Sequence, residues 1–172
     1  MTVFSIRIAT IDDAPLLQRL GSKTFSDTFS AFNTAENMKR YIEKNFSSDK
    51  VKEELLDTNA QTILLHDGAE CVGFARLRRG GNPVEIQGKA IEIERIYVEK
   101  DYIGGGVGNA LMQECIRRAK EDGVEVIWLG VWEHNPRAIR FYEKNGFKKF
   151  SEHVFMLGDD AQTDWLMRKD LN

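Results

Sequence analysis

A run of four glycines and one valine between positions 104 and 108 is the stretch of this sequence most suited to chemistry. Glycine permits positive φ angles and lets a ligand approach the backbone without a Cβ clash. The stretch before the run, Ile91–Val98, alternates and is rich in β-branched residues, which predicts a strand. Apolar residues recur at helical spacing from Val107 onward, so a helix is expected to begin at the glycines. The unpaired N–H groups and partial positive charge of that helix end predict a phosphate site, formed by Gly104, Gly105, Gly106, Val107, Gly108 and Asn109.

The glycine run matches neither of two common nucleotide-binding patterns. No Lys-Ser or Lys-Thr pair follows it, which excludes a nucleotide P-loop. A dinucleotide fold needs a tighter turn from strand to helix than the polar segment Glu99–Ile103 provides. On this stretch alone, the alternative is a mobile loop followed by an ordinary amphipathic helix.

A second pattern lies further along, from Asn135 to Phe147, and reads NPRAIRFYEKNGF. It resembles the N-x-x-A-x-x-x-Y-x-x-x-G-F pattern of the GCN5-related N-acetyltransferases (GNAT). The segment Ile103–Gly108 resembles the same family's Gln/Arg-x-x-Gly-x-Gly/Ala motif, with Ile103 in place of the usual polar residue. Both motifs occur in the family's order and spacing, and the resemblance covers essentially the whole chain. It implies a single α/β domain over residues 1–172, with a mixed, mostly antiparallel sheet of about seven strands flanked by helices.

The resemblance implies acetyl-CoA as the acetyl donor and a small-molecule amine as the acceptor. In the family, main-chain amides of the glycine loop hold the coenzyme A pyrophosphate. Ile96, Tyr97 and Val98 correspond to the strand segment whose main chain pairs with the pantetheine arm, and an N–H there can stabilise an oxyanion. Asn135 and Lys144 match positions that contact the pantetheine and phosphate parts of the cofactor, although both could simply be solvated surface residues.

Four further residues bear on the chemistry of acetyl transfer. An amine is almost wholly protonated at pH 7, so a nearby carboxylate is needed, and Glu94 matches the family position often occupied by a general base. By the two-residue period of a strand, Glu92, Glu94, Ile96 and Val98 are expected to share one face. Tyr142 matches the tyrosine that donates a proton to the coenzyme A sulfur; its alternative is packing on the sheet. Cys115 belongs to an apolar helical stripe, so direct attack in a ternary complex is expected rather than an acetyl-cysteine.

The C-terminal segment Phe155–Met167 is similar to the signature of the bacterial PaiA type of spermidine/spermine acetyltransferases within this family. That likeness suggests a polyamine acceptor, for which Glu92, Asp159 and Asp160 are candidate substrate-binding carboxylates. Glu92 could also be an exposed strand residue, and the two aspartates a solvated hairpin turn. The alternatives are an acetyltransferase that acts on another small amine or on a peptide amine, and a non-catalytic regulatory protein that binds acyl-CoA. Dimers are frequent in similar proteins, so a homodimer is possible.

The elements expected to position these residues alternate between strands and helices. A Thr10/Asp13 cap predicts a first helix from Ile11, which Gly21 could interrupt. Phe25, Phe29 and Phe32 then fall at helical spacing, which favours core packing over a substrate wall. Further helices are expected from Thr34, Val51, Val107 and Pro136. Strands are expected at Phe4–Ile8, Gln61–Leu65, Cys71–Leu77, Ile91–Val98, Val126–Val131, Phe147–Met156 and Thr163–Met167, with an exposed, mobile loop at Arg78–Lys89.

Length and composition narrow the class of protein. With 172 residues and 42% hydrophobic content, the chain can form one globular core. It lacks an apolar run of about 20 residues, and Met1–Asp13 lacks the pattern of a signal peptide, so a soluble cytoplasmic protein with no membrane partner is expected. Two distant cysteines, Cys71 and Cys115, predict neither a disulfide framework nor a metal site. A net charge of −3 makes nucleic-acid binding unlikely.

Overall fold

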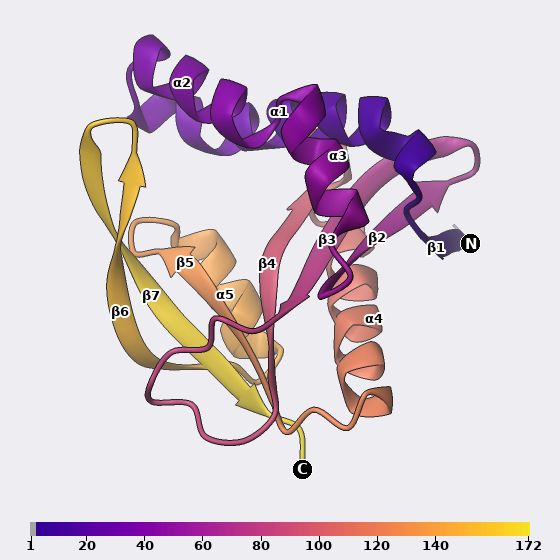
Figure 1. The fold of residues 1–172 in the computed structure, drawn as a ribbon, viewed down its shortest axis with the longest axis vertical. Coiled ribbons are helices and arrows are strands. Elements are labelled where there is room, and N and C mark those ends of the chain that lie inside the picture. Colours follow the sequence, from indigo (N-terminus) through magenta and orange to yellow (C-terminus); the bar gives the residue numbers. More distant parts are fainter. Residues whose placement is uncertain (1–2) are drawn as a thin grey trace.

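The computed structural model describes residues 3–172 and shows a seven-stranded sheet with helices on both faces (Figure 1). The sheet order is β1-β2-β3-β4-β5-β7-β6, and every neighbouring pair is antiparallel except β4 and β5. The predicted α/β fold with a mixed, mostly antiparallel sheet is therefore confirmed. The strands are β1 (Phe4–Ile8), β2 (Ala60–Asp67), β3 (Glu70–Arg79), β4 (Ala90–Val98), β5 (Val126–Trp132), β6 (Lys148–Leu157) and β7 (Asp160–Asp170). The helices are α1 (Ala14–Phe29), α2 (Ala35–Asn45), α3 (Ser48–Leu56), α4 (Val107–Glu121) and α5 (Pro136–Lys144), with short 3-10 turns η1 (Ile11–Asp13), η2 (Ser30–Phe32) and η3 (Lys100–Tyr102).

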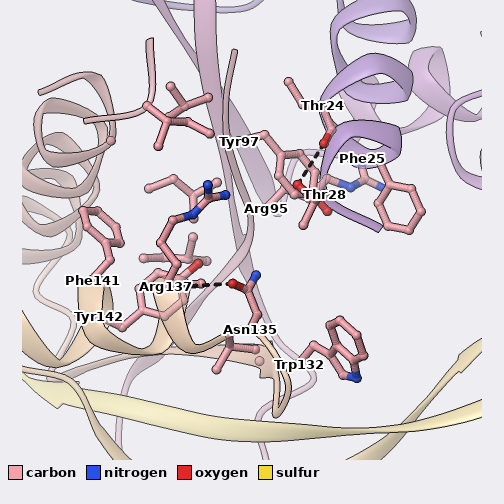
Figure 2. A pocket seen from close by; sticks show the side chains of 18 of the residues that line it. Thr24, Phe25, Thr28, Arg95, Tyr97, Trp132, Asn135, Arg137, Phe141 and Tyr142 are labelled. Carbon is pink, nitrogen blue, oxygen red and sulfur yellow. Dashed lines mark hydrogen bonds between the residues drawn. The ribbon is translucent and has the colours of Figure 1, made fainter. Parts of the chain in front are cut away.

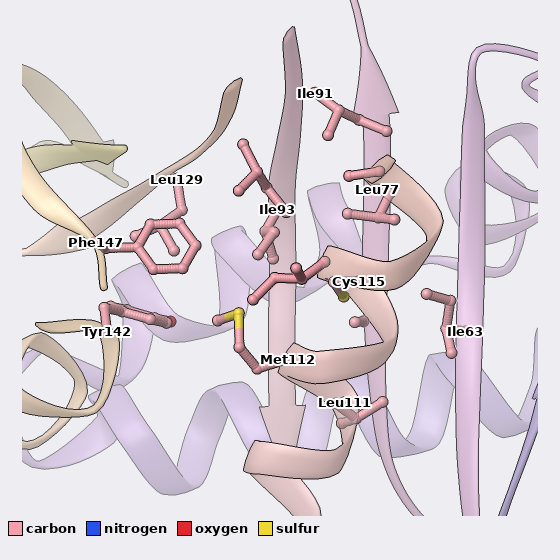
Figure 3. Close-up of a cluster of buried hydrophobic side chains, with 14 of the residues drawn as sticks. Ile63, Leu77, Ile91, Ile93, Leu111, Met112, Cys115, Leu129, Tyr142 and Phe147 are labelled. Carbon is pink, nitrogen blue, oxygen red and sulfur yellow. The ribbon is translucent and has the colours of Figure 1, made fainter. Parts of the chain in front are cut away.

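Apolar side chains cover the sheet on both faces. On one face, α4 and α5 form the largest core cluster, in which Leu111, Met112 and Cys115 of α4 pack on the strands (Figure 3). On the other face, α1 and α3 pack against the sheet around Leu64 and Phe74. Because both faces are buried, the central strands are apolar on both sides, and this rigid sheet fixes the positions of the residues at its strand ends.

Helix α1 runs through Gly21, contrary to the expected interruption at that residue. The glycine is retained for a steric reason: a Cβ at Gly21 would lie 2.4 Å from Cε1 of Phe46. Before the helix, the Thr10 N–H donates to the Asp13 carboxylate at 2.7 Å, which confirms the predicted cap. The helix therefore extends as one piece as far as Phe29, and its last turns reach the cavity described below.

The connection between β3 and β4 is irregular and mostly exposed, as its composition predicts, but it begins only after Arg79 and holds one buried side chain. Strand β3 extends to Arg79, and Ile86 is buried beside Ala90, Trp128 and Leu166. The Trp128 indole also donates a hydrogen bond to the Asn82 carboxamide oxygen at 3.2 Å. Further hydrogen bonds join Ser151 to the Glu85 carboxylate at 2.8 Å and the Lys89 N–H to Glu125 at 2.9 Å. The buried isoleucine and these hydrogen bonds anchor the segment, and none of them is visible as a periodic pattern.

The two cysteines, Cys71 and Cys115, are free thiols buried in the core, in agreement with their predicted places in a strand and a helix stripe. Among residues 3–172, no helix is both long and apolar enough to cross a membrane. The same residues contain no group of three or more His, Cys, Asp or Glu side chains placed to hold a metal ion.

Candidate active site

The centre of the candidate site is a divergence between strands β4 and β5. Their parallel pairing covers only Ala90–Glu92 against Val126–Trp128, although β4 continues to Val98 and β5 to Trp132. A cavity of about 660 Å³ opens beyond the paired positions, and its wall takes residues from α1, β4, the glycine loop, β5, α5 and the β6–β7 hairpin (Figure 2). The facing edges of the two strands can therefore offer main-chain donors and acceptors to a ligand.

The glycine loop forms one end of this cavity. Gly104 and Gly106 have φ angles of 86° and 91°, so the predicted need for positive φ is met at these two positions. Gly106 is the N-cap of α4, and no side chain caps that helix end. Gly105 and Val107 lie behind the wall, and the Val107 side chain is fully buried. The residues of the loop that line the cavity are Ile103, Gly104, Gly106, Gly108 and Asn109.

Three cationic side chains of α5 also line the cavity: Arg137, Arg140 and Lys144. Their spacing places them along one side of the helix, near the uncapped end of α4. Charged donors and helix N–H groups together suit a ligand that carries several phosphates. Lys144 was predicted to contact the cofactor. The two arginines were not, although they lie at helical spacing from it and that signal could have revealed them.

Tyr142 faces the sheet from α5, where it is 8% exposed and lines the cavity. Its ring packs edge-on against Phe141 and Phe147, with centroid separations of 5.5 and 6.0 Å. Burial raises the pKa of the Tyr142 phenol above its ordinary value, so the hydroxyl keeps its proton at neutral pH. Asn135 caps the start of α5, because its Oδ1 accepts a hydrogen bond from the Ala138 N–H at 3.2 Å (Figure 2).

A β-bulge in β4 lies beside the cavity. Arg95 pairs with Arg76 of β3, but the next pair joins Ile93 to Leu77. Glu94 is therefore an extra residue on β4, and the alternation of side chains changes phase at this point. A single inserted residue of this kind cannot be read from the hydrophobic pattern of one strand.

The bulge corrects the expectation that Glu92, Glu94, Ile96 and Val98 share one face. Ile96 and Val98 pack against the core cluster under α4 and α5. Tyr97 instead packs against the clusters under α1, α2 and α3. All three residues at the strand end still line the cavity, as does Glu94.

Glu94 is held by two arginines. Its Oε2 lies 3.1 Å from Nε of Arg76, which is 3% exposed, and 3.7 Å from Nε of Arg78. Arg76 also donates to the Glu54 carbonyl oxygen at 2.9 Å and contacts Asp57 at 3.3 Å. The Glu94 carboxylate thus lines the cavity while its charge is already paired with arginine side chains.

Aromatic side chains form the half of the cavity opposite the glycine loop. Phe25 is 1% exposed and stacks on Tyr41 with a centroid separation of 4.1 Å, as core packing predicts. Phe29 lies 5.9 Å from the Trp132 ring, and both line the cavity. Phe32, which shares their spacing, is instead 62% exposed. Two of the three phenylalanines, Phe25 and Phe29, therefore line the cavity, although their spacing predicted mainly core packing.

Asp164 is a carboxylate in this half that sequence reasoning did not identify. It lies on β7 opposite Trp132 and lines the cavity. Its side chain is 15% exposed, and the nearest basic side chain is that of His153, whose Nε2 lies 3.9 Å from Oδ2. Burial raises the pKa of Asp164 to about 6, with an opposing contribution from His153. No local motif marks this residue, because strand register brings it to the cavity.

The three predicted substrate carboxylates lie outside the main cavity wall. Glu92 lies in a second recess of about 440 Å³, 3.9 Å from Nε of Arg78. Burial, followed by the charge of Glu94, raises the pKa of Glu92 to about 7. Asp159 accepts a hydrogen bond from Asn37 at 2.9 Å, and Asp160 accepts one from Gln162 at 2.8 Å.

A mixed sheet that splits between two parallel strands, with a phosphate site on one side of the split, is the architecture of an acetyltransferase. Residues 23–147 match the Acetyltransferase (GNAT) family. The chain therefore belongs to that family, and it is an acetyl-CoA-dependent N-acetyltransferase. It is 37% identical over 172 residues to an uncharacterised N-acetyltransferase in the pepI 3' region of Lactobacillus delbrueckii subsp. lactis, covering 99% of each chain.

Two more distant similarities concern proteins of Thermoplasma acidophilum. A spermidine N(1)-acetyltransferase is 24% identical over 168 residues, with 95% of each chain covered. The crystal structure of a PaiA N-acetyltransferase in complex with coenzyme A superposes with a TM-score of 0.81 at 22% identity, covering 98% of this chain and 99% of that one. The second similarity confirms the fold.

The residues present fit acetyl-CoA. The uncapped end of α4 and the three cations of α5 suit its phosphates. The unpaired edge of β4 beyond Glu92 suits the amide groups of its pantetheine arm. Tyr142 lies within the same wall, so one cavity offers a complementary surface for each part of the cofactor.

Proposed function

We propose that the enzyme acetylates a primary amine of a polyamine by direct transfer in a complex that contains both substrates. The observation that carries the proposal is the charge asymmetry of a single cavity. One half has the uncapped helix end and the cations Arg137, Arg140 and Lys144. The other half has the carboxylates Glu94 and Asp164, and the one arginine that lines it, Arg95, is paired with Glu54 at 2.6 Å. An anionic donor and a cationic acceptor are thereby directed to opposite halves of the cavity.

The groups in the wall suit the chemistry of amide formation. Bound acetyl-CoA supplies an acetyl thioester. In the net reaction an N–C bond forms and the C–S bond breaks; of the two protons lost by the ammonium group, one goes to sulfur and one to solvent. The free edge of β4 at Ile96–Val98 supplies N–H groups for the carbonyl oxygen. Tyr142 holds a proton at Oη for the departing sulfur. Glu94 adds to the attraction for the ammonium group.

Direct transfer is supported by the state of the thiol near the site. Cys115 is fully buried in the core cluster and does not line the cavity. Burial raises its pKa to about 12, which leaves almost no thiolate at neutral pH. An acetyl-cysteine intermediate would need both access and a thiolate, and this thiol has neither.

The polyamine acceptor is supported by the second recess and by the distant spermidine acetyltransferase relative. The recess is lined by Glu85, Glu92 and Glu152, together with His153. Because His153 also lies 3.9 Å from Asp164, the recess adjoins the acceptor half of the main cavity. A chain with several ammonium groups can place one in each space, which a monoamine cannot do.

The test is thiol release from acetyl-CoA with spermidine, spermine, butylamine and an alanine-initiated peptide, with products identified by mass spectrometry. We expect the polyamines to give the highest kcat/KM. E92Q should raise KM for spermidine but not for butylamine, and E121Q, an exposed change on α4, should alter neither. Preference for the monoamine or the peptide would retain acetyl transfer and reject the polyamine site. Acetyl-CoA binding without turnover on any amine would favour a non-catalytic regulatory protein. That alternative is suggested by Ile103, which replaces the usual polar residue of the family's cofactor loop.

A further inference from the structure

We propose that Asp164 is the catalytic residue that binds the acceptor ammonium group and accepts its proton. The inference rests on the proposed function and extends it to a residue of the C-terminal segment Phe155–Met167 that was not among the predicted site residues. Asp164 Oδ1 is buried and has no hydrogen-bond partner among residues 3–172. The same side chain lines the cavity beside its cross-strand partner Trp132, which Figure 2 labels and whose ring lies 5.9 Å from that of Phe29.

The neighbouring strand leaves this carboxylate accessible. Gly130 of β5 lies beside Asp164, and a Cβ at Gly130 would be 3.3 Å from Oδ2 and 3.8 Å from the His153 ring. Gly130 is exposed although its strand neighbours Leu129 and Val131 are buried. The missing side chain thus opens the cavity floor at the position of the carboxylate.

An unpartnered carboxylate oxygen in a buried site is costly, because desolvation is not offset by a hydrogen bond. Burial of this kind without a protein partner suits a group whose partner arrives with the substrate. A primary ammonium group carries three N–H donors and a positive charge, and therefore supplies what Asp164 lacks.

Glu94 is the other carboxylate of the acceptor half, and the contacts distinguish the two. Glu94 Oε2 is already 3.1 Å from Nε of Arg76 and 3.7 Å from Nε of Arg78, so two guanidinium groups of the protein already pair with it. Asp164 has only His153 at 3.9 Å. We therefore assign to Glu94 the attraction of the cationic substrate and to Asp164 the acceptance of its proton.

The surroundings of Asp164 set the pH at which it can act. Titratable or charged groups face it from three elements: His153 on β6, Tyr41 on α2, and Tyr97 and Arg95 on β4. Burial dominates, which places the pKa of Asp164 at about 6. An acid of this strength is ionised at neutral pH and holds a proton better than an ordinary aspartate.

The proton balance is simple. The ammonium group transfers one proton to Asp164 Oδ1, which leaves a neutral amine and a neutral carboxylic acid. The nitrogen lone pair then forms the N–C bond as the C–S bond breaks. Tyr142 gives its proton to the sulfur, and the second nitrogen proton, lost as the amide forms, restores that of Tyr142. Asp164 then returns its proton to solvent, so that one of the two protons of the ammonium group ends on sulfur and one in solvent.

The experiment compares D164N with D170N, which changes the same residue type on the same strand but at a surface ion pair with Arg168. D164N should lower kcat/KM for the amine by about 10²-fold or more, and D170N should leave it unchanged. The Kd for acetyl-CoA should be the same in all three proteins. In the wild type, kcat/KM should fall with one proton below about pH 6, and this limb should be absent in D164N.

Binding provides a readout that does not depend on turnover. Calorimetric titration of spermidine into the coenzyme A complex should show weaker binding to D164N than to the wild type and D170N. Unchanged kcat/KM, an unchanged acid limb of the pH profile or unchanged spermidine affinity in D164N would each overturn the assignment. If E94Q loses the acid limb and D164N keeps it, the role of proton acceptor passes to Glu94. Absence of turnover in the wild type with every amine would instead reject the proposed function. If D164N does not fold, a wild-type profile without an acid limb near pH 6 also overturns the inference.

Discussion

Replacing Asp164 by asparagine should stabilise the fold at neutral and alkaline pH. The pKa of this carboxyl group rises from 3.8 to about 6 because it is buried. A rise of about two units corresponds to about 3 kcal/mol, at ~1.4 kcal/mol per unit. The folded state binds this proton more tightly than the unfolded state does. The contribution of protonated Asp164 to the unfolding free energy is therefore fully present below about pH 4 and is lost as the pH rises through about 6. The buried amide of asparagine also lacks a partner, so we expect a net gain of about 1–3 kcal/mol at about pH 8.

Urea unfolding followed by tryptophan fluorescence measures this effect. The difference in unfolding free energy between D164N and the wild type should grow by about 1.4 kcal/mol from about pH 5 to about pH 8. D170N serves as the control for the change in net charge and should show no such growth. A difference that is independent of pH, or a D164N protein that is less stable than the wild type at about pH 8, would show that Asp164 has a stabilising partner and would refute the reasoning.

Three further substitutions test other parts of the site. Y142F should lower kcat by about 10-fold or more while the Kd for acetyl-CoA and the unfolding free energy stay nearly constant; unchanged turnover would remove this hydroxyl from the mechanism. G108A should stabilise α4 by up to ~1 kcal/mol, since its Cβ would lie 3.6 Å from the Phe141 ring, yet weaken acetyl-CoA binding in a calorimetric titration; equal affinity would place the cofactor away from this helix end. R76M should lower the unfolding free energy by about 3–5 kcal/mol in urea titration, because Glu94 loses its closest partner in a buried network. A loss below ~1 kcal/mol would show that Arg78 compensates.

The parts of the site that follow from local pattern could be predicted from the sequence. The glycines at 104–108 and the helix after them form a contiguous signal, and the positive φ angles at Gly104 and Gly106 confirm its physical basis. The start of α5 at Pro136, after the Asn135 cap, is equally local. Both features depend on residues within a few positions of one another.

The remaining features depend on contacts that no local pattern records. Gly21 lies within α1 at a position where a side chain would clash with Phe46, 25 positions later. The bulge at Glu94 depends on how β4 pairs with β3. Asp164 reaches the cavity only through the register of β7 with β5. Residues placed by strand register therefore escaped prediction, whereas the glycine loop and the start of α5 did not.

The most direct test of acetyl transfer between two substrates in one cavity is a set of initial velocities with acetyl-CoA and spermidine varied together. We expect velocities that require both substrates and double-reciprocal plots that intersect, because the donor and acceptor halves of the cavity must be filled at the same time. Parallel lines would indicate an acetyl-enzyme and contradict direct transfer. A velocity that is independent of spermidine would contradict the assignment of the acidic half to a polyamine.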